Sequence, residues 1–164
     1  MMGVKELGLD RKAIVPLLKS LEYMHTASLI FVDLPSQDNA GLRRGRKTLQ
    51  EVYSFAIAEL TGLFLTQKAV KEQATLDTFD PKVVLKLIQY SAQVTQDMYK
   101  GQAMDLESKG KSLNIEQLNT MPHYKTGVAF EASIIHPLIL AELDKPTMEA
   151  LKNFTRHAGI AFQI

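Results

Sequence analysis

The sequence VDLPSQDNAGLRRGRKT at residues 32–48 decides how the chain is interpreted, because it interrupts segments that otherwise have helical spacing. Its two carboxylates, Asp33 and Asp38, precede four cations within residues 43–47. One proline and two glycines predict an irregular backbone. Carboxylate oxygens suit hard cations such as Mg²⁺, and adjacent arginines can bind phosphate oxygens through paired hydrogen bonds. Two interpretations follow: a diphosphate site with a metal and a cationic clamp, or an ordinary solvated loop with a capping aspartate.

Apolar residues on both sides of this loop recur every three or four positions, which predicts amphipathic helices. One helix precedes the loop, with Pro16 either in its first turn or at a kink. A second helix is expected over residues 48–72, buried on most sides because residues 55–65 are nearly all apolar. Asp80 as cap and Pro81 as first helical residue predict a third helix that ends near residue 109.

The last third of the chain also has helical signals. Asn114 with Gln117 is typical of a capping box and opens a short helix. Residues 127–143 form another apolar helix, which Pro137 is expected to bend, and the Asp-Lys-Pro turn after it starts the last helix. No strand and no hairpin turn are expected. The sequence thus predicts an all-α protein, an antiparallel helical bundle that forms one helical domain over residues 1–164.

Composition excludes several classes of protein. The chain has 164 residues with 19 basic and 18 acidic side chains, so its net charge gives no reason to expect nucleic acid or an anionic membrane as partner. It has no cysteine, which excludes disulfides, thiolate metal sites and cysteine nucleophiles. The charged N-terminus does not predict a signal peptide, and no apolar run reaches membrane-spanning length. We therefore expect a cytoplasmic protein without a membrane span.

The order of residues in the loop resembles the first Asp-rich motif of trans-polyprenyl diphosphate synthases, the family that includes farnesyl and geranylgeranyl diphosphate synthases. The bacterial form of that motif is Asp-Asp, four residues, Asp-Asn, two residues, then Leu-Arg-Arg-Gly, and residues 32–45 match it except at Val32. Three more segments resemble the family in order and spacing: Gly-Gln-x-x-Asp-Leu at 101–106, Lys-Thr at 125–126 and Phe-Gln at 162–163. The resemblance covers nearly the whole chain, as the central portion of such a synthase.

The resemblance implies a partial isoprenoid synthase fold and a Mg²⁺-dependent prenyltransferase of isoprenoid biosynthesis. In that reaction an allylic diphosphate ionises, the double bond of isopentenyl diphosphate attacks the allyl cation, and a proton is lost. It also implies roles for residues at matching positions. They are metal ligands (Asp33, Asp38), binders of the diphosphates (Arg43, Arg44, Lys125), polar residues lining the cavity (Gln102, Thr126, Gln163) and an acid near the metals (Asp105); of these, Lys125, Gln102 and Asp105 are the catalytic candidates.

Departures from the family pattern leave the activity open. Val32 replaces the first acid of the motif and cannot bind a metal, so weaker binding of Mg²⁺ and of the allylic diphosphate is expected. The family's second Asp-rich motif and its segment for isopentenyl diphosphate are missing from the sequence, which predicts a weak or inactive synthase. The alternative is a non-catalytic helical subunit that binds diphosphates or regulates a synthase, as a homodimer or with an intact partner subunit; a plain helical scaffold is a third possibility.

Overall fold

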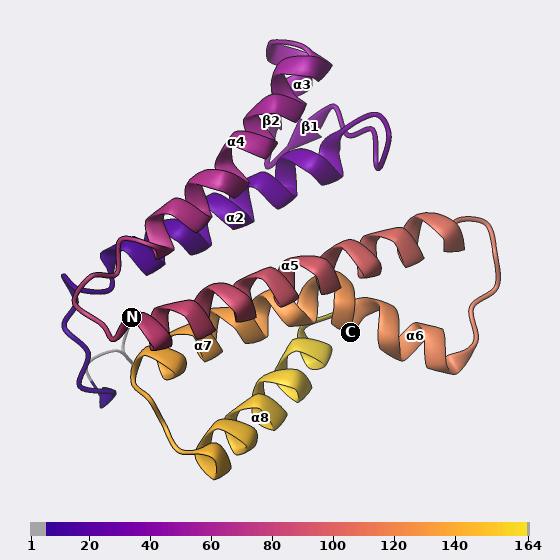
Figure 1. Ribbon diagram of the computed structural model, residues 1–164. Helices are drawn as coiled ribbons and strands as arrows, with labels where there is room; N and C mark the ends of the chain where they lie inside the picture. The colour runs from indigo at the N-terminus through magenta and orange to yellow at the C-terminus, as the bar shows by residue number, and fades with distance from the viewer. Residues whose placement is uncertain (1–5, 164) are drawn as a thin grey trace. The chain divides into compact units, whose positions relative to one another are not determined.

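The structure is a computed structural model that describes residues 6–163, apart from the side chains of residues 115, 116, 118, 119, 126 and 159–163. The chain divides into two compact units. Residues 12–76 form the first unit, and residues from 77 onward, with the described residues up to 11, form the second. Each unit is described by itself (Figure 1), and the expectation of one domain over residues 1–164 stays a prediction.

Two long helices that lie side by side make up the first unit: α2 (Val15–Asp33) and α4 (Phe55–Gln73). Pro16 stands in the first turn of α2, where its missing N–H costs no hydrogen bond, so the first of the two expectations for this proline is confirmed. Small residues set the distance between the helices. A β-carbon added to Gly62 would lie 2.7 Å from the ring of Phe31, so the ring packs directly on the α4 backbone.

The helix expected over residues 48–72 is interrupted. A short helix, α3 (Leu49–Val52), ends at Tyr53, and α4 begins after Ser54. The cause is local: the hydroxyl of Ser54 accepts a hydrogen bond from the backbone N–H of Ile57 (3.3 Å), which makes Ser54 the N-cap of a new helix.

The prediction of no hairpin was wrong. Strands β1 (Leu42–Arg43) and β2 (Arg46–Lys47) pair antiparallel through a two-residue turn. Arg44 and Gly45 have φ of 52° and 75°, and a tight hairpin of this kind requires positive φ at both turn positions. The turn was missed because an arginine stands where asparagine or aspartate usually signals such a turn.

The second unit is helical throughout its described residues. Its elements are α5 (Pro81–Ser108), α6 (Ile115–Pro122), the π-helical turn η1 (His123–Gly127), α7 (Val128–Leu140) and α8 (Lys145–Gln163).

Three predicted helix starts in this unit are confirmed by their caps. Asp80 accepts a hydrogen bond from the N–H of Lys82 (2.7 Å), and Pro81 is the first residue of α5. Asn114 and Gln117 form both hydrogen bonds of a capping box, at 2.8 and 3.0 Å. Asp144 accepts from the N–H of Thr147 (2.8 Å) ahead of α8.

The core of the second unit lies between α5 and α7, which run side by side in Figure 1. Leu87 on α5 and Ile135 on α7 are fully buried, and so is the polar His136. The ring of His136 lies 2.6 Å from the hydroxyl of Ser91 and hydrogen-bonds the carbonyl of Ala132, so a polar link joins the two helices. The all-α fold class is confirmed, and no helix within residues 6–163 is long and apolar enough to cross a membrane.

Candidate functional site

An ion pair joins the two halves of the predicted motif. Asp33 is the last residue of α2, and Arg43 lies on β1. The guanidinium donates from Nε to Oδ2 (2.7 Å) and from Nη2 to Oδ1 (2.5 Å), a two-pronged geometry that is the strongest form of this interaction. Asp33 is only 5% exposed. The hydrogen bond to Asp33 raises the pKa of Arg43, and the charges of Asp33 and Asp38 raise it further.

Backbone contacts hold the loop around this pair. The amide nitrogen of Gln50 donates to the carbonyls of Asp33 (2.7 Å) and Ala40 (3.1 Å). The buried hydroxyl of Thr48 donates to the carbonyl of Ala40 (2.8 Å), and the N–H of Ala40 donates to the carbonyl of Asp33 (3.1 Å). Sequence reasoning missed Gln50, because nothing in a single sequence indicates that a glutamine on a four-residue helix turns back to this loop.

The remaining cations of the loop are exposed. Arg44 and Gly45 form the turn of the hairpin, and both have positive φ. Arg44, Arg46 and Lys47 are all exposed, unlike the half-buried Arg43. The adjacent arginines of the motif are therefore in different states: one is held by a carboxylate and one faces solvent.

The loop does not fit a preformed magnesium site. Val32 has no ligand atom, and both oxygens of Asp33 accept hydrogen bonds from Arg43. Asp38 is exposed. Within the described residues, no group of three or more His, Asp or Glu side chains could hold a metal ion. The metal-ligand roles of Asp33 and Asp38 stay predictions.

A second cluster of predicted site residues lies at the π-helical turn. The Nζ of Lys125, on η1, is 2.6 Å from Oδ2 of Asp105, on α5. The two elements touch at Gly101, where an added β-carbon would overlap the backbone of Tyr124 and Lys125. Glycine is thus required for the close approach that brings Asp105 and Lys125 together. Wide π-helical turns inside α-helical segments are frequent at functional sites.

Buried polar atoms without partners among the described residues occur on α5 and η1, and one, Oε1 of Gln50, occurs beside the loop. Neither the nitrogen nor the oxygen of the Gln102 side-chain amide has a hydrogen-bond partner among the described residues, and Nδ1 of His123 also has none. Burial is the main cause that lowers the pKa of His123. Such atoms are rare in native proteins and indicate a water molecule or ligand. His123 was not predicted from the sequence.

The predicted residues thus fall into two groups, one in each unit. Asp33, Asp38, Arg43 and Arg44 belong to the loop, whereas Gln102, Asp105 and Lys125 lie on α5 and η1. The side chains of Thr126 and Gln163 lie outside the described residues.

Comparison with solved structures identifies the fold. An isoprenoid synthase family member from Thermotoga neapolitana is 30% identical with a TM-score of 0.87, and covers 98% of this chain and 60% of its own. A geranyltransferase from Helicobacter pylori, complexed with magnesium and isoprenyl diphosphate, is 30% identical with a TM-score of 0.86, over 94% of this chain and 54% of its own. The fold is therefore that of the isoprenoid synthases, of which the chain forms a part.

Sequence comparison identifies the family. The polyprenyl synthetase model matches residues 3–164, and the chain belongs to this family. It is 36% identical to a farnesyl diphosphate synthase of Geobacillus stearothermophilus, over 98% of this chain and 56% of that protein. It is 32% identical to the large subunit 2 of a heterodimeric geranylgeranyl pyrophosphate synthase of Arabidopsis thaliana, over 96% of this chain and 43% of that protein. The chain spans about half the length of these relatives.

Proposed function

We propose that this chain carries diphosphate-binding parts of a polyprenyl diphosphate synthase, which condenses an allylic diphosphate with isopentenyl diphosphate. The observation that carries the proposal is the hairpin after α2, which presents Arg44 at an exposed turn beside the Asp33–Arg43 pair. Membership of the polyprenyl synthetase family supports the same reaction class. A cytoplasmic location is part of the proposal.

The proposed reaction requires positive charge near the diphosphate group that leaves the allylic substrate. Negative charge develops on the leaving oxygen, and fixed cations stabilise it. In the loop, Arg44 is the exposed cation of the arginine pair. In the second unit, Lys125 is held by Asp105, so its ammonium is oriented before any ligand arrives. The amide of Gln102, which has no partner among the described residues, can donate to and accept from a polar substrate group.

A condensation assay with labelled isopentenyl diphosphate and an allylic diphosphate tests the reaction. Slow product formation by the wild-type chain, reduced further in a Lys125→Met variant, is the expected result, because Val32 cannot serve as a metal ligand in the motif. Diphosphate binding without any product would favour the second candidate, a non-catalytic diphosphate-binding or regulatory subunit. Val32 in the motif and the occupied carboxylate of Asp33 are the observations that favour that candidate.

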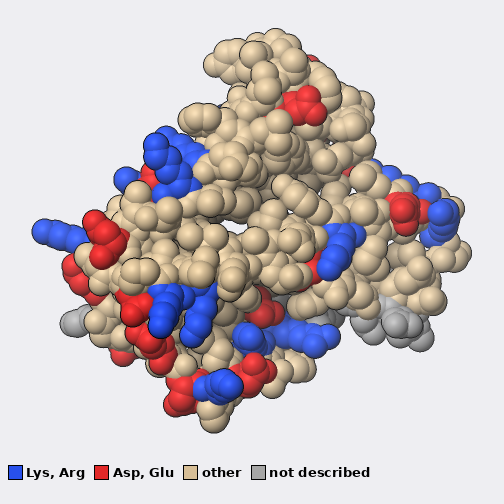
Figure 2. Space-filling model, in the orientation of Figure 1, with Lys and Arg blue, Asp and Glu red and all other residues tan. Residues whose placement is uncertain are grey.

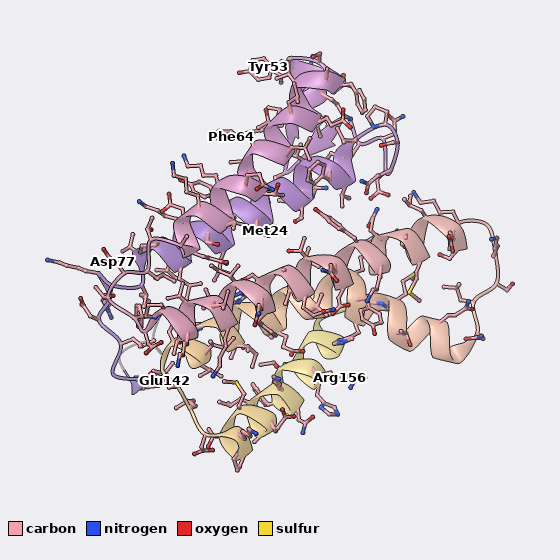
Figure 3. The ribbon with its side chains drawn as sticks, viewed as in Figure 1. Met24, Tyr53, Phe64, Asp77, Glu142 and Arg156 are labelled. Carbon is pink, nitrogen blue, oxygen red and sulfur yellow. The ribbon has the colours of Figure 1, made fainter. Side chains whose placement is uncertain are left out.

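Association with a second copy of the chain, or with a partner synthase subunit, is also part of the proposal. Large apolar side chains that are 44–68% exposed lie within residues 52–64, from the end of α3 into α4, and are here called the apolar face of α4: Val52, Tyr53, Phe55, Ile57, Leu60, Leu63 and Phe64. Figure 2 shows few charged groups over α3 and the start of α4 on the face it draws, and Figure 3 labels Tyr53 and Phe64 there. Exposed apolar areas of this kind favour association.

Sedimentation velocity tests the association. A Leu60→Glu substitution on the apolar face of α4 is expected to convert a dimer to a monomer, because it would bury an unpaired charge in the contact. Leu85→Glu on α5 is a matched control, since Leu85 is 56% exposed and lies outside this face. Wild-type chain that is monomeric at all concentrations would contradict association with a second copy of the chain.

A further inference from the structure

We propose that Arg43 neutralises the carboxylate of Asp33, and that no divalent ion binds this carboxylate while the ion pair is intact. The pair then holds the loop at residues 33–48 in its folded form without a metal. The pair lies within the loop itself, and its role does not depend on the proposed reaction.

The geometry of the carboxylate is the first support. Each oxygen of Asp33 accepts one hydrogen bond from the same guanidinium, at 2.5 and 2.7 Å. The side chain of Asp33 is 7% exposed, so little of the carboxylate is open to a further ligand. Magnesium usually keeps several of its waters and needs near-octahedral geometry, which demands more room than this carboxylate offers.

The lack of neighbouring ligands is the second support. The residue before Asp33 is Val32, which has no oxygen in its side chain. The loop offers at most the two carboxylates of Asp33 and Asp38, and so few charged ligands make a weak site for a divalent ion, because affinity depends on their number. The described residues bring no third acid, histidine or cysteine into a metal-binding group with this loop.

The loop backbone gives the third support. Gln50 and Thr48 bind the carbonyls of Asp33 and Ala40, and the N–H of Asp38 donates to the carbonyl of Val32 (3.0 Å). These contacts join the start of the loop to its end through protein atoms alone. A metal is therefore not required to close the loop, and Arg43 completes it by neutralising the buried charge of Asp33.

A consequence follows for variants of the pair. Removing Arg43 leaves a buried carboxylate without a counter-charge, which is strongly unfavourable. Any cation that can reach the carboxylate then stabilises it electrostatically. Arg43→Gln is therefore expected to create affinity for a divalent ion at Asp33 that the wild-type chain lacks.

Manganese binding tests the proposal, with Mn²⁺ as a paramagnetic probe and no diphosphate present. Nuclear magnetic resonance follows the broadening of the backbone amides of Asp38 and Ala40 in the full chain. In the wild type we expect no selective broadening of these amides. In Arg43→Gln we expect apparent affinity for Mn²⁺ to rise by about tenfold or more, which corresponds to about 1.4 kcal/mol.

Arg46→Gln is the matched control. Arg46 lies directly across from Arg43 in the hairpin and its loss changes the net charge equally, but it is exposed. An equal rise in Arg46→Gln would show a long-range charge effect and overturn the proposal. Selective broadening at Asp38 and Ala40 in the wild type, abolished by Asp33→Asn, would also overturn it and needs no Arg43 variant to fold. Because no substrate is added, a failed condensation assay leaves these results unaffected.

Discussion

In the loop at residues 33–48 the carboxylate of Asp33 and the carbonyls of Asp33 and Ala40 all accept hydrogen bonds from side chains. Beside η1, by contrast, both polar atoms of the Gln102 side-chain amide and Nδ1 of His123 are buried without a partner among the described residues. At Gln50, beside the loop, the amide oxygen is in that state, but the amide nitrogen makes two hydrogen bonds. The polar groups of the first region therefore mainly hold its own shape. The second region keeps a whole amide buried and available, which is the state expected where a ligand or water completes the structure.

The largest effect on stability is expected from Gly101→Ala, which disrupts the packing of the second region. The new methyl group would overlap the backbone of Tyr124 and Lys125, so η1 must move away from α5. We expect the free energy of unfolding to fall by about 3 kcal/mol, because overpacking against backbone cannot be relieved by a side-chain rotation. Urea denaturation measures it. Gly41→Ala is the control from the loop, since nothing lies within 4 Å of its added carbon; equal losses in both variants would contradict the close approach.

The next largest effect on stability is expected from Arg43→Gln, which breaks the ion pair of the first region. Breaking the pair leaves Asp33 buried and charged; because the Arg43 side chain is itself 35% exposed, the expected loss is about 2 kcal/mol, below that of a fully buried pair. Denaturant unfolding measures the free energy of unfolding of this variant and of Arg46→Gln, for which the loss should stay within about 0.5 kcal/mol. If the two arginine variants were equally stable, the ion pair would not be what holds the loop.

Substitutions of two glutamines, one in each region, are expected to have smaller effects on stability. Gln50→Met removes two hydrogen bonds and should cost about 1–2 kcal/mol. Gln102→Met removes a buried amide with no described partner and should leave stability unchanged or raise it by up to about 1 kcal/mol. Thermal unfolding of both variants tests this. Opposite signs are expected, and a similar loss in Gln102→Met would mean that its amide is already satisfied.

The smallest effect is on pH dependence, in the second region. Burial lowers the pKa of His136 and of His123 below the ordinary value. Below the unfolded pKa of about 6.5, the unfolded chain therefore binds more protons than the folded chain. The free energy of unfolding is highest above that pH and decreases as pH falls, by at most about 1.4 kcal/mol per pH unit for each histidine. Amide hydrogen exchange in α5 and α7 at pH 7.5 and 5.5 measures it, and His136→Gln should reduce the slope. An unchanged slope in that variant would contradict a buried neutral His136.

Much of the fold was predictable because helix signals are local. Asp80 with Pro81, and Asn114 with Gln117, act within one turn of the chain, so the residues themselves specify where the helices start. The hairpin was not predictable in this way. Its turn uses Arg44 at positive φ, a conformation that the residue type does not favour and that the surrounding contacts impose.

The sequence indicated candidate site residues, which stay predictions, but it did not indicate how they pair. The order of residues in the loop indicated Asp33 and Arg43, yet whether a carboxylate faces a metal or an arginine depends on how the segment between positions 33 and 43, which are 10 residues apart, folds back. Gln50 and His123 give no local signal, because their significance comes from atoms distant in sequence. The division into two units likewise reflects contacts across the whole chain.

The central claim, that the chain binds prenyl diphosphates through the cations of its motif, is tested most directly by calorimetric titration with a non-hydrolysable allylic diphosphate analogue. We predict binding to the wild-type chain and about tenfold weaker binding to Arg44→Gln, because a charge-assisted contact to phosphate is worth about 1.5–3 kcal/mol in favourable cases. No binding at millimolar analogue, or equal affinity of the wild type and Arg44→Gln, would contradict the claim.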